Sequence, residues 1–320
     1  MTGLFATIRA RAAEVARRAR FVAIDRAALE RLAVDLADDP PPPPVWDPAT
    51  YHVGTPRSRL AYVLTLDAIN FGSGWFPRLR KREGRSGYFT VAMGLKDRFD
   101  AEGPWSATEL AALSPLDLAH VTGQTLEDPE VIELMALFAT ALNDLGTLLA
   151  SRYGGSFAAL VEAAGARAER LVALLAEMPL YRDVSTYDDF EVPFYKRAQI
   201  TAADLAIAFE GQGFGRFEDL DELTCFADNL VPHLLRCEGV LHHREDLAAR
   251  IERGELLEHG SPEEVEIRAC GLHAVEEIVA AVRARGGRTT AQLVDMTLWH
   301  RGQRPESKAR PRHRARCPYY

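Results

Sequence analysis

An aspartate within an apolar stretch is the residue of this sequence best placed to do chemistry. Asp228 follows Phe226 and Ala227 and precedes Leu230 and Val231. Burying a carboxylate is costly unless it is paired or hydrogen-bonded, so acids in such positions often belong to a functional site. Asp228 could therefore be a catalytic carboxylate. The alternative is that it caps a helix running through Val231.

A second carboxylate lies beside an aromatic ring near the end of the chain. Asp295 and Trp299 are four residues apart in a segment with helical spacing, so they share one face of the helix. A carboxylate can accept two parallel N–H bonds from a guanine-like edge while the ring stacks on its face. This pair could hold a purine-like base, or it could be a rim acid beside a core tryptophan.

Two further segments could contact a nucleotide. Residues 66–77, which include Asn70, combine a helix end, a Gly-Ser-Gly turn and three aromatic side chains. They could form a base-stacking platform or a buried corner. Lys196 and Arg197 precede a helix predicted to start at Thr201, where cations could bind phosphate or form a solvated surface.

Metal and cofactor chemistry have little support in the sequence. Cys237, His242 and His243 are close together, but no second ligand pair has the spacing of a zinc site. His52 is a lone histidine whose default interpretation is a loop residue. We expect neither a metal nor a cofactor.

Apolar periodicity predicts a mainly α protein. Residues with helical spacing predict helices at 25–36, 131–149, 157–178, 263–285 and 290–300. Asp25 could cap the first of these, and the second follows an Asp128-Pro129 start. Ser106-x-x-Glu109 and Thr201-x-x-Asp204 have the form of capping boxes. Strands are predicted only at 88–91 and 192–195, and prolines 40–44 must be extended. The expected architecture is a single compact helical domain with at most a small β element.

A glycine-rich turn separates two helical segments in the middle of the chain. A helix is predicted at 201–210 and helical spacing at 220–235, with Gly211, Gly213 and Gly215 between them. This pattern indicates a helix-hairpin-helix, whose glycines would also permit close approach of a phosphate. The plainer interpretation is a tight corner between packed helices.

Composition limits the class of protein and its surroundings. The chain has 320 residues, 47% of them hydrophobic, which is enough for a full core. Its net charge of −8 disfavours a phosphate backbone as partner, and its four cysteines and lack of a long apolar run favour a soluble protein in a reducing compartment. Basic clusters lie near both ends, and a frayed C-terminus is expected. We divide the chain into an N-terminal helical segment with a proline-rich strap, 1–44, and a main domain, 45–320.

Several dispersed blocks together resemble the queuosine salvage protein family. The resemblance extends from about Val45 to the C-terminus, and blocks occurring in the expected order are more specific than any one of them. These blocks are residues 66–77, Tyr195–Ile200, Phe226–Pro232, Glu266–Ala269 and Arg314–Tyr320.

The resemblance implies a queuosine 5′-phosphate N-glycosidase with a helical core similar to helix-hairpin-helix DNA glycosylases. Its catalytic aspartate falls on Asp228. Its base-binding residues fall on His52, Phe226, Asp295 and Trp299. To these we add, on charge and position alone, Lys196 for the phosphate and Asn70 for the ribose.

The implied reaction releases queuine and ribose 5-phosphate for queuine salvage in tRNA modification. We expect a cytoplasmic monomer that binds neither nucleic acid stably nor membrane, although nothing in the sequence fixes the oligomeric state. Asp228 would stabilise positive charge on the ribose, and Asp295 would assist departure of a base that lacks the usual protonatable ring nitrogen. The alternatives are a nucleic-acid base glycosylase and a non-enzymatic queuine-binding protein.

Overall fold

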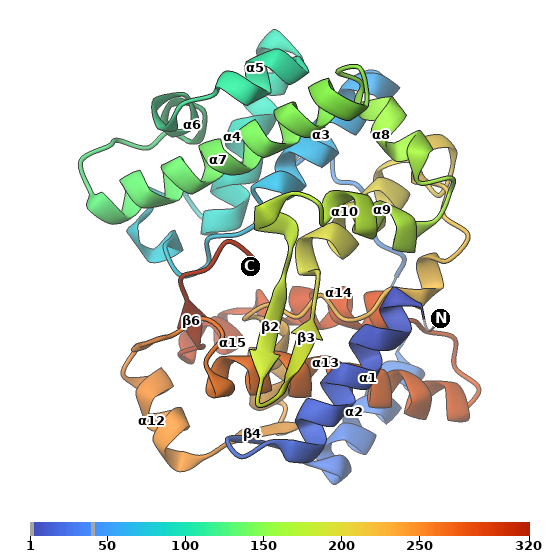
Figure 1. Cartoon of the computed structure of the whole chain (residues 1–320). Coiled ribbons are helices and arrows are strands. Elements are labelled where there is room, and N and C mark those ends of the chain that lie inside the picture. The colour runs from blue at the N-terminus through green and yellow to red at the C-terminus, as the bar shows by residue number, and fades with distance from the viewer. Residues whose placement is uncertain (1–2, 40–41) are drawn as a thin grey trace. The chain divides into compact units, whose positions relative to one another are not determined.

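The computed structural model describes residues 3–39 and 42–320, and helices dominate them (Figure 1). Internal contacts divide the chain into two compact units. Unit 1 comprises the described residues of Met1–Pro44, Asp183–Lys196 and Asp221–Arg316, and unit 2 comprises Val45–Arg182, Arg197–Leu220 and Cys317–Tyr320. The prediction of a mainly α fold is confirmed.

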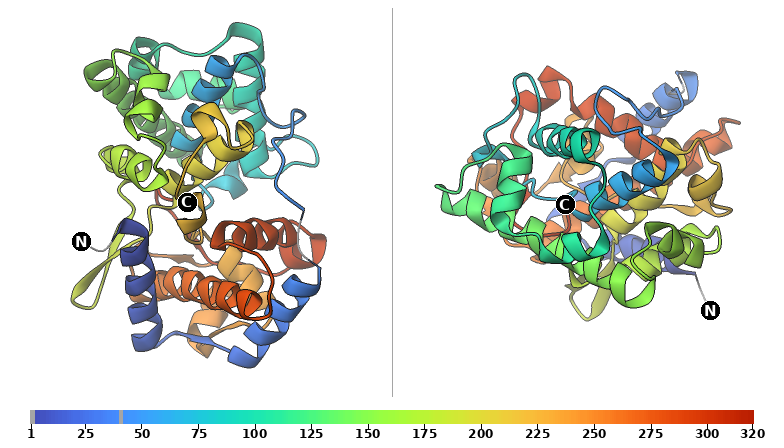
Figure 2. Two further views of the ribbon diagram at one scale, coloured as in Figure 1. Left: turned by 90° about the vertical axis from the view of Figure 1, so that its right-hand side faces the viewer. Right: turned by 90° about the horizontal axis from the view of Figure 1, so that it is seen from above.

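Unit 1 is built around one long helix, α13 (Pro262–Ala284). α13 packs against α1 and α2 on one side and against α11 and α14 on another, and Figures 1 and 2 show it beside α1 and α2. Because neighbours surround α13, even its charged residues Glu264, Glu266 and Arg268 are fully buried. The other helices of unit 1 are α1 (Leu4–Arg18), α2 (Arg26–Asp38), α11 (Val231–Cys237), α12 (Glu245–Glu252), α14 (Ala291–Gly302) and α15 (Pro305–Ala309).

Three short two-stranded sheets complete unit 1. β1 (Val22–Ile24) pairs antiparallel with β4 (Leu241–His243), and β5 (Leu256–Leu257) pairs parallel with β6 (Arg314–Ala315). β2 (Val184–Tyr187) and β3 (Phe190–Pro193) form a hairpin whose turn residue Asp188 has a φ of +49°. The predicted strand at 192–195 thus exists but ends two residues earlier.

Unit 2 is a helical assembly around α7 (Pro129–Arg152), which packs against α3, α5 and α6. Asp128 caps α7 as predicted. By length and composition α7 could cross a membrane, but 56% of its apolar window is buried, as in the core helix of a soluble protein. Its other helices are α3 (Pro56–Ala68), α4 (Gly87–Glu102), α5 (Ala107–Ala112), α6 (Pro115–Thr122), α8 (Phe157–Ala163), α9 (Ala168–Leu175) and most of α10 (Lys196–Ala208).

Most predicted helices are confirmed, and one is divided. α2, α7, α13 and α14 match their predictions closely, and Asp25 caps α2 as expected. The helix predicted at 157–178 is interrupted between α8 and α9, because Gly165 and Ala166 adopt φ values near +58°. The predicted Ser106–Glu109 capping box is present at α5.

Three local predictions are wrong. Residues 88–91 belong to α4, because Ser86 caps a helix there. Thr201 lies inside α10 and bonds back to the carbonyl of Arg197, so it does not form a capping box with Asp204. The helical spacing at 220–235 covers only a 3₁₀ turn at Leu220–Glu222, an irregular segment and then α11, so a helix-hairpin-helix core is not confirmed.

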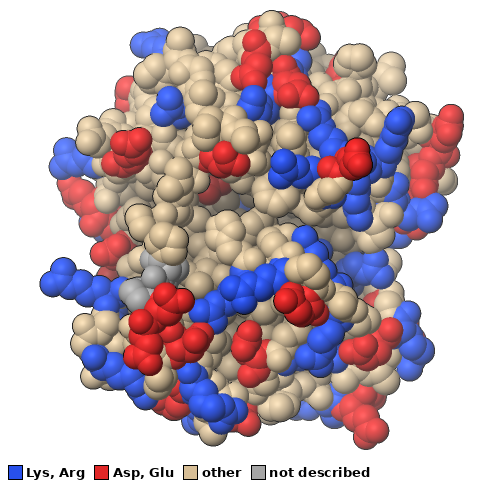
Figure 3. Space-filling model, turned by 180° about the vertical axis from the view of Figure 1, so that it is seen from behind, with Lys and Arg blue, Asp and Glu red and all other residues tan. Residues whose placement is uncertain are grey.

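Two further predictions concern the proline run and the C-terminus. Pro40 and Pro41 lie outside the described residues, and Pro42–Pro44 have no regular secondary structure. The C-terminus is not frayed, because Tyr320 is buried and its carbonyl oxygen accepts the Gly72 N–H at 3.1 Å. On the surface, Figure 3 shows acidic and basic side chains interspersed over one face.

Two histidines of unit 1, His243 and His313, have buried ring nitrogens and are expected to make its stability sensitive to acid. Burial lowers the pKa of both His243 and His313 to about 3 from the ordinary 6.5. Between about pH 6.5 and about pH 3, the unfolded chain therefore binds protons that the folded chain does not. The free energy of unfolding falls as the pH drops through this range. His243 has no hydrogen-bond partner on either ring nitrogen within the described residues.

We expect His243→Phe to reduce this acid sensitivity. Urea denaturation between about pH 7 and about pH 4.5 should show a smaller fall in unfolding free energy than the unaltered protein shows. The matched control is His242→Phe at the neighbouring, 60% exposed side chain, which should keep the original slope. Equal slopes for all three proteins would contradict the prediction.

Candidate functional site

Asp228 lies in an irregular segment that leads into α11. The preceding residues Leu223–Ala227 are buried, whereas Asp228 itself is half-buried. Its Oδ1 atom accepts the backbone N–H groups of Leu230 at 2.7 Å and Val231 at 3.0 Å. Asp228 Oδ1 is thus bound to the backbone at the start of α11, whereas Oδ2 makes no hydrogen bond within residues 3–39 and 42–320.

Asp295 lies on α14 and contacts the same segment. Its Oδ2 atom accepts the Phe226 N–H at 2.9 Å and the Cys225 S–H at 3.1 Å. The side chain is buried, while its Oδ1 makes no hydrogen bond in the described part of the chain. Because Oδ2 already has two donors, Asp295 has only one oxygen left for a base.

Burial and a neighbouring charge keep Asp295 protonated. Burial, followed by the negative charge of Asp228, raises the pKa of Asp295 to about 8. Burial, followed by the charge of Asp295, also raises the pKa of the Cys225 thiol well above its usual value. A carboxyl group that is protonated near neutral pH can serve as a proton donor.

Two aromatic residues flank these acids. Phe226 is 5% exposed, and its backbone N–H connects the Asp228 segment to Asp295. Trp299 lies one helical turn after Asp295 on α14 and is half-buried, with its ring edge-on to His300. Unit 1 thus brings Phe226, Asp228 and Asp295 together and places Trp299 on the same face of the helix as Asp295.

Lys196 approaches this group, whereas Arg197 does not. Lys196 is buried, and its positive charge lowers the pKa of Asp295, which places its ammonium group within electrostatic range of the acids. Arg197 is buried in unit 2, where it donates to the carbonyls of Ala68 and Leu180. The interpretation of these two cations as a solvated surface is therefore wrong.

The predicted residues His52 and Asn70 lie in unit 2. His52 is buried, with Nδ1 2.5 Å from Asp100 Oδ1 and Nε2 2.6 Å from Ser58 Oγ. Both ring nitrogens are therefore engaged, and a contact with a base would have to replace one of these bonds. Asn70 Nδ2 donates to Asp67 Oδ1 at 3.4 Å.

The aromatic segment beside Asn70 is a buried corner. Phe71 and Trp75 are each 2% exposed, and Trp75 Nε1 donates to Glu133 at 2.8 Å. These rings pack inside unit 2, so they cannot stack on a base without unfolding the corner. Of the two interpretations of residues 66–77, the buried corner is correct.

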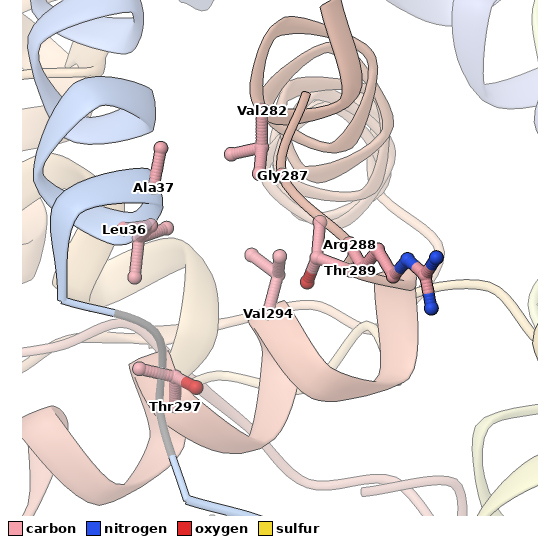
Figure 4. Close-up of a pocket in the computed structure, with 8 residues that line it drawn as sticks. All are labelled: Leu36, Ala37, Val282, Gly287, Arg288, Thr289, Val294 and Thr297. Carbon is pink, nitrogen blue, oxygen red and sulfur yellow. The ribbon is translucent and has the colours of Figure 1, made fainter. Parts of the chain in front are cut away.

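Other features of unit 1 lie away from the acids. A cavity of about 210 Å³ is lined by residues of α2, α13, α14 and the loop between α13 and α14 (Figure 4). Val294 and Thr297 face it from the side of α14 opposite Asp295. Among residues 3–39 and 42–320 no group of three or more His, Cys, Asp or Glu side chains could hold a metal ion.

Comparison with known proteins places this arrangement in a family. Residues 50–320 match the model of the queuosine salvage protein family. The chain belongs to this family. It is 38% identical over 312 residues to a queuosine 5′-phosphate N-glycosylase/hydrolase of Sphaerobacter thermophilus, a match that covers 96% of this chain and 95% of the relative.

Animal members of the queuosine salvage family are similar as well. Proteins with the same name from Bos taurus and Mus musculus are 32% and 33% identical, each over 83% of both chains. The resemblance inferred from the dispersed sequence blocks is therefore confirmed.

Sequence reasoning missed four residues that support the site. Arg268 donates to the carbonyl of Ala227, directly before Asp228, and pairs with Asp183. Cys225 donates to Asp295. Burial lowers the pKa of Arg312 and the charge of Asp228 opposes this, so Arg312 lies within electrostatic range of Asp228. Of these four residues, only Arg268 lies in a sequence block that carries the family resemblance, Glu266–Ala269.

Proposed function

We propose that this protein hydrolyses the N-glycosidic bond of queuosine 5′-phosphate and releases queuine and ribose 5-phosphate for salvage. The observation that carries the proposal is the pairing of a carboxylate, Asp228, with a protonated buried acid, Asp295, in a member of the queuosine salvage family. Relatives named queuosine 5′-phosphate N-glycosylase/hydrolase support the substrate. A pair of carboxyl groups beside the bond that is cleaved is typical of glycosidases.

Asp228 would act on the sugar. Cleavage of an N-glycosidic bond builds positive charge on the ribose ring, and a nearby carboxylate stabilises that charge more in the transition state than in the substrate. The unengaged Oδ2 is the oxygen available for this contact, since Oδ1 is held by two backbone N–H groups. The same carboxylate can orient or deprotonate the water that attacks C1′.

Asp295 would act on the base. Queuine is a 7-deazaguanine, so the ring nitrogen at which purine hydrolases often donate a proton is a carbon. A protonated Oδ1 can instead donate to the carbonyl of the base and stabilise the negative charge that develops as the C1′–N bond breaks. This proposal replaces the expected bidentate acceptance of two N–H groups, because Oδ2 is already engaged.

The remaining binding residues follow from their positions. Phe226 and Trp299 would contact the faces of the base and Lys196 its nucleotide phosphate. His52 and Asn70 stay predictions for the base and the ribose. We also propose that the protein is cytoplasmic, which its free cysteines support, and that it binds no nucleic acid stably, which its acidic net charge supports. We propose further that it is a monomer without a membrane partner.

We expect Lys196→Met to weaken binding of the nucleotide selectively. Loss of a charge-assisted contact should reduce the affinity for queuosine 5′-phosphate by roughly ten- to a hundredfold, and the affinity for queuosine much less. Calorimetry in an Asp228→Asn background would measure both without turnover. Lys81→Met, at an exposed lysine, is the control. Equal losses for nucleotide and nucleoside would contradict a phosphate contact.

The proposed reaction is tested by incubating the protein with queuosine 5′-phosphate and identifying the products by mass spectrometry. Queuine and ribose 5-phosphate should appear in equal amounts. Binding of queuine without product formation would indicate a binding protein. Release of base only from a queuosine-containing oligonucleotide, with salt-dependent binding, would indicate a nucleic-acid glycosylase.

A further inference from the structure

A buried ion pair underlies the segment that carries Asp228. Arg268 on α13 is fully buried, and its two terminal nitrogens donate to the Asp183 carboxylate at 3.0 and 2.7 Å. Its Nε donates to the Ala227 carbonyl at 2.9 Å. The guanidinium lies 4.0 Å from the centre of the Phe194 ring. Arg268 therefore fixes the backbone immediately before the catalytic aspartate.

The other end of the pair holds the segment that carries Lys196. Asp183 Oδ2 accepts the backbone N–H of Lys196 at 3.1 Å. The Asp183 carbonyl accepts the N–H groups of Phe194 at 2.9 Å and Tyr195 at 3.2 Å. Tyr195 has a φ of +48°, which a non-glycine residue adopts only when its surroundings hold it. One ion pair thus connects the backbones of two proposed substrate-binding residues.

Stability alone does not account for such a pair. Removing two charges from water is costly, and apolar residues of similar volume often replace a buried ion pair without loss of stability. What apolar residues cannot reproduce is the directed hydrogen bonding of the planar guanidinium to a carboxylate and a carbonyl at once.

We propose that the Asp183–Arg268 pair is a positioning device that holds Asp228 and Lys196 at a fixed spacing. This inference rests on the proposed function, in which Asp228 acts at C1′ and Lys196 binds the phosphate. Neither Asp183 nor Arg268 touches the substrate. A displacement of about 1 Å between the two binding points is enough to lower the rate about a hundredfold.

The test replaces the pair by apolar residues and measures turnover of queuosine 5′-phosphate. Glu264 Oε1 also lies 3.8 Å from an Arg268 terminal nitrogen, so the double variant Asp183→Leu/Arg268→Met is made in a Glu264→Gln background, which avoids a buried carboxylate without its cation. These changes remove the charges together, so we expect the double variant to keep its melting temperature within a few degrees. Its kcat should fall roughly a hundredfold, with a much smaller change in KM. The matched control is Arg26→Met/Glu277→Leu, which removes a partly exposed ion pair that also has one partner on α13. Its kcat should not change.

Chemical rescue separates positioning from folding. We expect guanidinium at millimolar concentration to restore part of the kcat of Arg268→Ala and none in the double variant, which lacks the Asp183 carboxylate. An unchanged kcat in a folded double variant, or a double variant that does not fold, would overturn the inference. Absence of turnover in the unaltered protein would instead overturn the proposed function.

Discussion

Replacing Asp228 by asparagine is expected to abolish nearly all turnover while the fold survives. The amide oxygen of Asp228→Asn can still accept the N–H groups of Leu230 and Val231, so the start of α11 should remain intact. What is lost is the negative charge that we propose acts on the ribose. Since removal of one electrostatic contact to a transition state costs about a hundred- to a thousandfold in kcat, we expect a loss of this size.

This prediction is measured by steady-state release of queuine, with circular dichroism to verify folding. Asp221→Asn is the matched control, because Asp221 is an exposed aspartate that precedes the same irregular segment. Its kcat should equal that of the unaltered protein. Near-normal turnover by Asp228→Asn would refute the assignment of the catalytic carboxylate.

Asp295 is expected to impose an alkaline limit on activity. Its pKa is raised to about 8, so the protonated form predominates below that pH and is lost as the pH rises through it. If this form donates to the base, kcat/KM should decline above about pH 8 and the decline should report loss of one proton. Asp295→Asn carries a donor that does not titrate, so its residual activity should lack this alkaline decline.

Truncation of the same residue tests base binding. Asp295→Ala should lower the affinity for queuine by roughly ten- to a hundredfold, as expected for loss of a buried hydrogen bond to the ligand. Calorimetry with free queuine measures this directly. The control is Thr297→Val, on the opposite face of α14, which should leave the affinity unchanged. An unchanged affinity in Asp295→Ala would count against a contact between Asp295 and the base.

The sequence predicted those helices whose boundaries are set locally. α7 and α14 begin at Asp128 and Thr290, whose side chains accept backbone N–H groups of the first turn, and such caps are visible in the sequence. Failures occurred where local preference was ambiguous. Residues 88–91 have β-branched and aromatic side chains, yet the Ser86 cap starts a helix there. The break near Gly165 depends on two positive φ angles that no periodicity reveals.

The sequence singled out the two acids of the candidate site but not their electrostatics. Asp228 attracted attention as an acid among apolar neighbours, and Asp295 through its spacing from Trp299. Their proximity, which helps to protonate Asp295, arises from packing of α14 against α11 and the segment before it. Arg268 and Asp183 are 85 residues apart, so their pairing could not be inferred from spacing.

The most direct test of the account is a structure of the Asp228→Asn variant with queuosine 5′-phosphate bound. We predict that the side chain at position 228 lies within about 3.5 Å of the ribose C1′ or of a water aligned with it. Asp295 should contact the base in the same complex. A ligand whose C1′ lies far from position 228, with another group beneath the sugar, would contradict the account.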